Sequence, residues 1–218
     1  MSFTKLNFIA AILVTFGSSV VHAQDQGWYI GIGVGQSKAK DVGNCSDLQA
    51  LTPSTVSCSI KDTSTGAKLF GGYQFNQYVA VEAGYVDLGK FTLSASVPNP
   101  SPFNSASATN KVSGFSLDAV GTWPITPEFA VLGRIGLFLW KLEASTSIAV
   151  PPPPPPVQCC TSDNVTGTGA AFGVGAQYDF SKDIGVRAEF QRFASIGNDT
   201  TGKSDVELIS ASFVYRFR

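Results

Sequence analysis

The amino-acid sequence predicts an all-β fold, namely an eight-stranded antiparallel, up-and-down transmembrane β-barrel. Three observations predict it: an N-terminal leader for export, strand-like stretches joined by connections that alternate in length, and an apolar face on each stretch that charge hardly interrupts. Membrane barrels spread their hydrophobicity over many alternating strands, so they need no long apolar segment. The chain has 218 residues, of which 14% are charged, and this is consistent with one such domain.

The first 23 residues have the organisation of a secretory signal peptide. Lys5 gives a positive start, residues 8–16 form a short apolar run, and small residues precede Gln24. The run is too short to cross a bilayer as a helix. We therefore expect residues 1–23 to be removed on export and residues 24–218 to form an outer-membrane barrel domain.

Eight stretches then alternate between apolar and other residues, as strands with one apolar face do. They are residues 28–37, 67–75, 78–88, 112–123, 129–140, 170–180, 184–193 and a last stretch that begins near Val206. In the first four, the apolar face is formed by Trp28, Ile30, Ile32 and Val34; Ala67, Leu69, Tyr73 and Phe75; Val79, Val81, Ala83 and Tyr85; and Phe115, Leu117, Ala119 and Trp123. In the last four it is formed by Phe129, Val131, Ile135, Leu137 and Leu139; Phe172, Val174, Ala176, Tyr178 and Phe180; Ile184, Val186, Ala188 and Phe190; and Ile209, Ala211, Phe213, Tyr215 and Phe217.

The connections between these stretches alternate in length. Tight turns are expected at residues 76–77, 124–128 and 181–183, where turn-forming residues gather. Long loops rich in Ser, Thr, Pro and Asn are expected at residues 39–65, 89–111, 141–168 and 194–204. Short turns on one side and long loops on the other are typical of outer-membrane barrels.

The second face of the stretches decides between a membrane barrel and a soluble one. It combines Gly, Ala and Ser with isolated charges, which fits a narrow barrel interior, whereas the apolar face fits lipid. Aromatic residues gather near the expected short turns, as in an interfacial girdle: Trp28, Phe75, Tyr78, Trp123, Phe129, Phe180, Tyr215 and Phe217. A soluble exported β-barrel that binds a ligand inside is the alternative fold.

Two stretches resemble a known family. The segment GVGAQYDFSKDIGVRAEFQRF is similar to the seventh-strand region of the OmpA-like transmembrane barrels, and FAVLGRIGLFLW is similar to their fifth strand. The resemblance implies a barrel inserted by the outer-membrane assembly machinery, with structural, adhesive or weak porin-like roles. It covers the barrel only, so we expect the chain to be without the peptidoglycan-binding domain of full-length OmpA.

Six charged residues are expected in the lumen at similar depth: Lys68, Glu82, Asp118, Arg134, Arg187 and Glu189. Charges in a low-dielectric interior must pair, because each unpaired one costs several kcal/mol. We therefore predict a salt-bridged plug in which Glu82 or Glu189 pairs with Arg134 or Arg187. The alternative is a gate in which a change of partners opens a narrow path.

Catalytic and metal-binding functions are not expected. The only histidine, His22, lies in the predicted leader, so histidine-based acid–base chemistry is missing from the exported domain. The four cysteines, Cys45, Cys58, Cys159 and Cys160, fall in the expected long loops, where export favours disulfides over a metal site. Four cysteines allow three pairings, and the sequence leaves all three open.

The sequence thus predicts a small outer-membrane barrel with a structural and surface-interaction role, a lumen filled by charged residues and long extracellular loops. A narrow gated porin for small solutes is the alternative function. We expect a monomer without cofactors, surrounded by outer-membrane lipid and able to bind a surface ligand through its loops. The net charge of −1 gives no indication of nucleic-acid binding. The last strand, with Phe213, Tyr215 and Phe217, is expected to close the barrel and, by resemblance, to address the assembly machinery.

Overall fold

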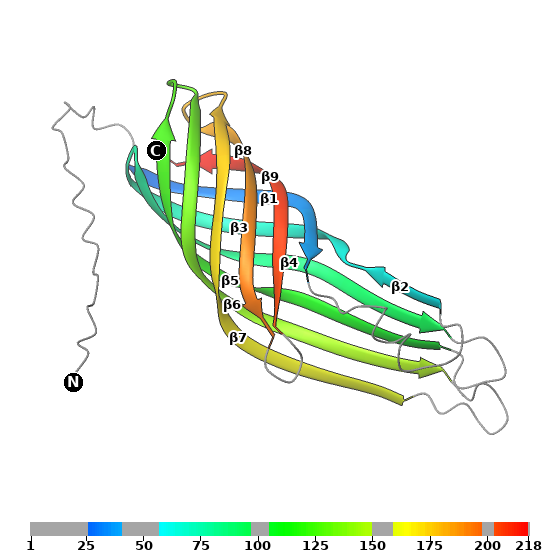
Figure 1. The fold of residues 1–218 in the computed structure, drawn as a ribbon. Helices are drawn as coiled ribbons and strands as arrows, with labels where there is room; N and C mark the ends of the chain where they lie inside the picture. Colours follow the sequence, from blue (N-terminus) through cyan, green and yellow to red (C-terminus); the bar gives the residue numbers. More distant parts are fainter. Residues whose placement is uncertain (1–25, 41–56, 97–104, 150–158, 198–202, 218) are drawn as a thin grey trace, which may run out of the picture.

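The computed structural model describes residues 26–40, 57–96, 105–149, 159–197 and 203–217. These residues form nine antiparallel strands. They are β1 (Gly27–Ala39), β2 (Ser57–Lys61), β3 (Thr63–Asn76), β4 (Val79–Ser96), β5 (Ser105–Pro124), β6 (Phe129–Ala149), β7 (Cys159–Asp179), β8 (Ile184–Ile196) and β9 (Ser204–Arg216). Eight of them close a barrel in chain order, and the predicted eight-stranded up-and-down barrel is therefore confirmed (Figure 1).

The last strand closes the ring. β9 pairs with β8 from Ile184↔Tyr215 onwards and with β1 from Tyr29↔Arg216 to Ala39↔Val206. The backbone amide of Phe217 also donates to the carbonyl of Trp28, at 2.8 Å. Because both edges of β9 are paired, the barrel wall has no open seam.

Short turns lie at one end of the barrel, at the positions that the sequence predicts. Asn76 ends β3, and its side-chain oxygen accepts hydrogen bonds from the amides of Tyr78 (2.8 Å) and Val79 (3.0 Å). The hydroxyl of Thr126 accepts from the amide of Phe129 at 3.0 Å in the turn between β5 and β6. Such side-chain caps fix a tight turn. The first and last barrel strands also begin and end at the side of the barrel where the three short turns lie (Figure 1).

The opposite end differs from the sequence prediction. Long loops were expected at residues 89–111 and 141–168, but β4 continues to Ser96, β5 begins at Ser105, β6 continues to Ala149 and β7 begins at Cys159. β2 pairs with β4 over residues that were expected in the first loop. These stretches are rich in Ser, Thr and Ala, which gives little apolar contrast for a sequence pattern to detect, while the backbone ladder forms irrespective of side chain.

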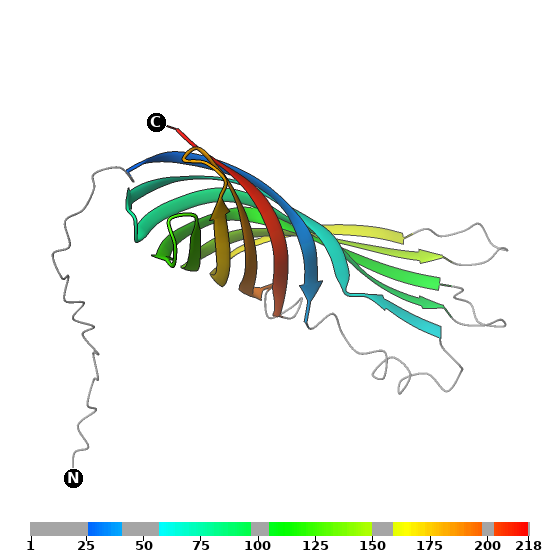
Figure 2. The same cartoon turned by 90° about the horizontal axis from the view of Figure 1, so that it is seen from above.

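The strands on one side of the barrel are therefore longer than those on the other side. β4, β5, β6 and β7, with β2 at one edge, extend well past the ends of β1, β8 and β9 as an open curved sheet, which we call the sheet extension (Figures 1 and 2). β8 pairs with β7 only from Ala171 to Asp179, so residues 159–168 of β7 pair with β6 alone among the described strands.

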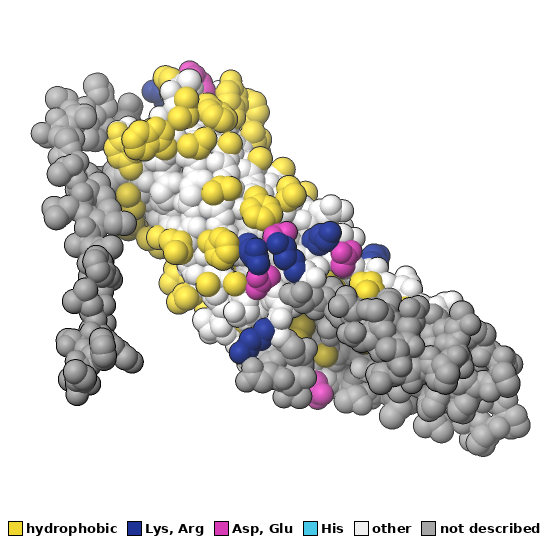
Figure 3. All heavy atoms as spheres, in the orientation of Figure 1, with side chains coloured by type: hydrophobic (Ala, Val, Ile, Leu, Met, Phe, Trp, Pro, Cys, Tyr) yellow, Lys and Arg dark blue, Asp and Glu magenta, His cyan; other side chains and the backbone are white. Residues whose placement is uncertain are grey.

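The apolar face of every barrel strand points outward. Large exposed apolar side chains include Ile32, Phe115, Ile135, Val174 and Ile209, whereas the residues between them are buried. Figure 3 shows apolar side chains spread over the outside of the barrel and charged side chains gathered where this band ends. The predicted aromatic residues at the short-turn end are exposed as well, and several contact one another edge to face, such as Tyr215 with Phe217 (5.1 Å between ring centroids). This inverted arrangement is that of a membrane barrel.

Glycines on the inner face leave room for the lumen side chains. A Cβ atom on Gly175 would lie 2.5 Å from the carbonyl oxygen of Ala188 and 2.7 Å from the Glu189 side chain. On the outer face, a Cβ on Gly133 would meet nothing within 4 Å.

We therefore expect Gly175→Ala to destabilise the barrel by about 1–3 kcal/mol, because the backbone oxygen cannot give way and overpacking is strained. Gly133→Ala should leave the stability unchanged. Urea unfolding of the two refolded variants measures the difference, and equal stabilities would show that the inner face is not tightly packed at this depth.

Candidate functional site in the barrel lumen

The structure brings all six predicted lumen charges together. Lys68 comes from β3, Glu82 from β4, Asp118 from β5, Arg134 from β6, and Arg187 and Glu189 from β8. All six are buried, because each is one of the alternate residues of its strand whose side chains face the lumen. We call this group the lumen charge network. It contains three cations and three carboxylates, so it is neutral as a whole.

Arg134 is the centre of the network. Its guanidinium group pairs with Glu82, lies 3.1 Å from Glu189 through Nε and lies 3.5 Å from Asp118 through Nη1. Neither oxygen of Asp118 has hydrogen-bond geometry with a described residue, so its interaction with Arg134 is mainly electrostatic. Three acidic residues from three strands therefore share this cation.

Glu82 and Glu189 each hold a second cation. Glu82 pairs with Arg187 and accepts a hydrogen bond from the hydroxyl of Tyr29 at 2.8 Å. Glu189 pairs with Lys68, whose ammonium group also donates to the side-chain oxygen of Gln191 at 3.0 Å. The pairs join strands on opposite sides of the lumen, so the network ties the walls together across the barrel.

Three further polar residues complete the network, and the sequence analysis did not single them out. They are Tyr29, Gln191 and Gln177, whose side-chain oxygen accepts from Nε of Arg187 at 2.8 Å. Each lies on the inner parity of a strand whose other face was correctly identified. Parity was therefore the available signal, although it could not show which charge each residue would contact.

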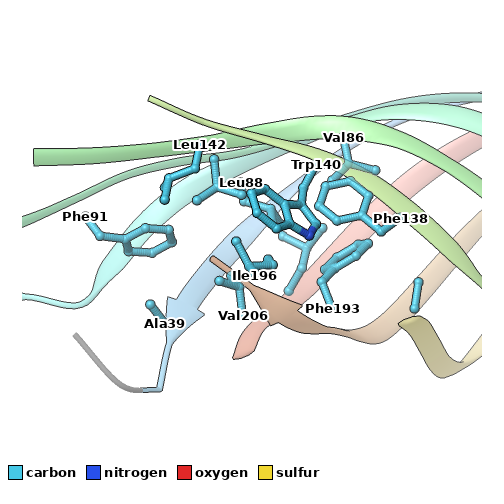
Figure 4. Close-up of a cluster of buried hydrophobic side chains, with 13 residues drawn as sticks. Ala39, Val86, Leu88, Phe91, Phe138, Trp140, Leu142, Phe193, Ile196 and Val206 are labelled. Carbon is cyan, nitrogen blue, oxygen red and sulfur yellow. The ribbon is translucent and has the colours of Figure 1, made fainter. Parts of the chain in front are cut away.

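Buried apolar clusters lie on both sides of the network, where the sequence analysis emphasised small and charged residues. Towards the sheet extension lies an outer apolar cluster that includes Leu88, Phe138, Trp140, Phe193 and Leu208 (Figure 4). Phe138 and Phe193 have ring centroids 4.6 Å apart. Towards the short turns lies an inner apolar cluster that consists of Tyr29, Phe70, Ala80, Val120, Leu132 and Val214.

A polar vestibule of about 610 Å³ lies at the short-turn end of the barrel. Gln74, Gln177, Asp179 and Arg216 line it, and Arg216 pairs with Asp179 at 2.9 Å. A second depression, of about 1320 Å³, is lined by Gly121 and Gly133 among others, and Glu189 of the lumen charge network also lines it.

The remaining predicted residues have simpler positions. Phe213 and Tyr215 point outward from β9, and Phe217 follows the strand, also exposed. Cys58 lies in β2, Cys159 and Cys160 begin β7 with side chains outside the described set, and Cys45 and the predicted signal peptide lie outside the described residues. Which cysteines pair therefore stays a prediction. Among the described residues no group of three or more His, Cys, Asp or Glu could hold a metal ion.

Comparison with known proteins agrees with this geometry. The family profile of the OmpA-like transmembrane domain matches residues 23–218. The chain belongs to the OmpA-like transmembrane domain family. It is 31% identical over 212 residues to outer membrane protein A of Salmonella typhi, covering 96% of this chain and 54% of the relative. It is 29% identical over 197 residues to outer membrane protein A of Klebsiella pneumoniae, covering 89% and 52%.

Solved structures share the fold of this OmpA-like barrel. Neisserial surface protein A aligns with a TM-score of 0.55 at 12% identity over 88% of this chain and 97% of that one. Ail, the attachment invasion locus protein of Yersinia pestis, aligns with a TM-score of 0.52 at 16% identity over 88% and 99%. The chain spans about half the length of the curated relatives it matches.

The protein is therefore a barrel of the bacterial outer membrane, as the sequence predicted. No helix in the described residues is long and apolar enough to cross a membrane. In such barrels the short turns face the periplasm and the other end faces outward. The sheet extension then projects outside the cell, and the vestibule opens to the periplasm.

Proposed function

We propose that this protein has a structural and surface-interaction role, with a closed lumen and no catalytic activity. The observation that carries the surface role is the sheet extension, which projects past the barrel on one side. The observation that supports a closed lumen is the neutral charge network between two apolar clusters. Eight-stranded barrels are normally filled by their own side chains.

Residues 159–168 of β7 give the surface role a mechanism. Their outer edge has no strand partner among the described residues, and Asp163 is the only charged residue in this segment. An unpaired, weakly charged edge can accept an extended segment of another protein as an added strand, because backbone hydrogen bonds supply the affinity. Ail, which shares the fold, is named for attachment and was solved with a heparin analogue.

Shortening the sheet extension tests this role. Ala144 pairs with Asp163, so deleting residues 144–163 and joining the ends by Asn-Gly removes most of the edge while keeping Glu143 opposite Asn164. Ser94 pairs with Ser107, so deleting residues 94–107 with the same turn is the matched control that leaves β7 intact.

We expect the first deletion to reduce adhesion of producing bacteria to cultured epithelial cells to the level of bacteria without the protein. The control should keep its adhesion, and both variants should keep heat-modifiable gel migration, which shows a folded barrel. If the first deletion adheres as well as the full chain, this edge is not the binding surface.

A narrow gated porin is the second candidate, and the periplasmic vestibule favours it. Gln177 and Asp179 line this vestibule, so the inner apolar cluster, the lumen charge network and the outer apolar cluster form the remaining barrier. Single-channel recording distinguishes the two functions. With a closed lumen, the refolded protein gives no conductance steps; a gated porin gives steps that change in Arg134→Ala and Glu82→Ala.

Three narrower proposals accompany this function. The exposed Phe213, Tyr215 and Phe217 would be read by the assembly machinery, in keeping with the family resemblance. The cysteines would form disulfides outside the cell, where oxidising conditions favour them. The protein would act as a monomer, and its partner would be a molecule outside the cell that binds the sheet extension.

A further inference from the structure

The vestibule at the short-turn end has the size and lining of a small-molecule site. Its volume of about 610 Å³ lies within the range of about 300–1,000 Å³ that is usual for such sites. Residues of all three short turns line it, and so do polar side chains from the inner face of four barrel strands. These are Gln74 on β3, Thr122 on β5, Gln177 and Asp179 on β7, and Arg216 on β9.

The polar side chains lie on opposite walls of the vestibule. The barrel strands close in the order β1, β3, β4, β5, β6, β7, β8, β9. In this ring β3 and β7 are four strands apart, and so are β5 and β9. Gln74 therefore faces Gln177 across the vestibule, and Thr122 faces Arg216. A molecule in the vestibule can be held from both sides.

The charged wall of the vestibule is neutral. Arg216 donates to both oxygens of Asp179, at 2.9 Å and 3.0 Å. A Cβ atom on Gly185, in the strand between them, would overlap with Oδ1 of Asp179. Glycine at this position therefore leaves the room in which the pair forms. Because the pair is satisfied within the protein, it leaves no net charge for a ligand to balance.

The other polar side chains have hydrogen-bonding groups to spare. Gln74 and Thr122 are half-buried, and their side chains make no hydrogen bond with a described residue. Gln177 donates to Asp179 at 2.9 Å and accepts from Nε of Arg187 at 2.8 Å. One amide hydrogen and one lone pair of Gln177 remain for another partner. Both walls thus offer donors as well as acceptors.

We propose that the vestibule binds a neutral sugar of one or two rings from the periplasm. An amide presents a donor and an acceptor side by side, and this matches two neighbouring hydroxyl groups of a sugar, each of which donates and accepts. Gln74 and Thr122 bind one side of the sugar, and Gln177 binds the other. Trp28 and Phe217 line the mouth and offer apolar surface to the ring carbons.

A charged ligand fits the vestibule less well. Asp179 and Arg216 already neutralise each other, so the charge of a ligand would lose water without gaining a counter-ion. At the rim, Glu128 and Lys182 are again one acid and one base, and both are exposed. The spare groups of Gln74, Thr122 and Gln177 are uncharged, which favours a ligand rich in hydroxyl groups.

The proposed site does not depend on conduction through the barrel. It lies on the periplasmic side of the inner apolar cluster, which includes Tyr29, Phe70 and Leu132. A sugar can therefore bind in the vestibule while the lumen stays closed.

The test is a titration of the ¹⁵N-labelled, refolded protein in micelles of a sugar-free zwitterionic detergent, followed by NMR of backbone and side-chain amides. The ligands are glucose, its carboxylate counterpart glucuronate and its ammonium counterpart glucosamine. Gln74→Leu/Thr122→Val removes the spare groups at similar volume. Gln36→Leu/Thr65→Val is the matched control, because Gln36 and Thr65 are paired and exposed on the outer face of β1 and β3. Heat-modifiable migration verifies that both variants are folded.

We expect glucose to shift the amide signals of vestibule residues with a dissociation constant of about 1–10 mM, which a few net hydrogen bonds supply. Gln74→Leu/Thr122→Val should bind glucose about tenfold more weakly, and the control should bind it as the unsubstituted chain does.

The two charged sugars test the proposal on the unsubstituted chain, whether or not a variant folds. Both should bind about tenfold more weakly than glucose. The proposal is overturned if glucose gives no saturable shift, if either charged sugar binds as tightly as glucose, or if the Gln74/Thr122 variant keeps its affinity. It is also overturned if the control loses as much affinity as that variant.

Discussion

Replacing Arg134 with alanine should destabilise the barrel by about 3–5 kcal/mol, because it leaves buried carboxylates without their main partner. Glu82 and Glu189 would keep one cation each, Arg187 and Lys68, but Asp118 would keep none among its described neighbours. The six-residue network would change from neutral to negative inside a low-dielectric lumen. Urea unfolding of the refolded variant in phospholipid vesicles measures this loss.

The matched control is Arg192→Ala at the rim. Arg192 also pairs with two carboxylates, Asp205 and Glu207, but its side chain is partly exposed, and ion pairs of that kind contribute about 0–1 kcal/mol. A loss of less than about 1 kcal/mol in Arg134→Ala would show that water enters the lumen and compensates the carboxylates. The closed-lumen account would then be wrong.

Replacing Ile135 with arginine should destabilise the barrel by about 2–4 kcal/mol, the cost of a charge on the lipid face near the bilayer centre. Ile135 is 69% exposed and lies in the middle of the apolar outer face of β6, which runs from Phe129 to Leu139. In a water-soluble protein, an arginine at so exposed a position would cost almost nothing.

Ser145→Arg is the control on the same strand and the same face, beyond Lys141 in the sheet extension. It is exposed to water in this account and should change the stability by less than about 0.5 kcal/mol. The same unfolding measurement serves for both variants. Equal, small effects would favour the soluble barrel over the membrane barrel.

The barrel itself could be predicted because alternation has a period of two and each strand has one nearly uninterrupted apolar face. The alternation places Leu69, Ile135 and Phe172 on one face of their strands. The leader, the loop asymmetry and the composition of the two faces predict that this face is the outside, and all three residues are exposed. The tight turns were equally predictable, since Asn76 and Thr126 make local hydrogen bonds.

The sheet extension could not be predicted, because its stability comes from backbone pairing rather than side-chain pattern. Residues 105–111 and 144–149 contain mainly Ser, Thr and Ala, which are as frequent in loops. Likewise, Phe138 and Phe193 meet only because β6 and β8 curve round the same lumen. Contacts across a barrel depend on strand tilt and register, and a single sequence does not specify either.

The lumen charges were an intermediate case. Parity placed Glu82, Arg134 and Glu189 inside, and the cost of an unpaired charge required that they pair. The central position of Arg134 and the part played by Tyr29 depend on side-chain reach across the barrel. Electrostatics could therefore predict that a network forms but not its connections.

The claim that apolar residues face lipid while the lumen is closed is tested most directly by the native tryptophans. The chain has three: Trp28 and Trp123 are 65% and 66% exposed on the outer face, whereas Trp140 is 4% exposed within the outer apolar cluster. Three variants, each retaining one tryptophan and carrying phenylalanine at the other two positions, would be refolded into phosphatidylcholine brominated near the glycerol end. We predict strong fluorescence quenching of Trp28 and Trp123 and none of Trp140; quenching of Trp140 with Trp123 unaffected would contradict the account.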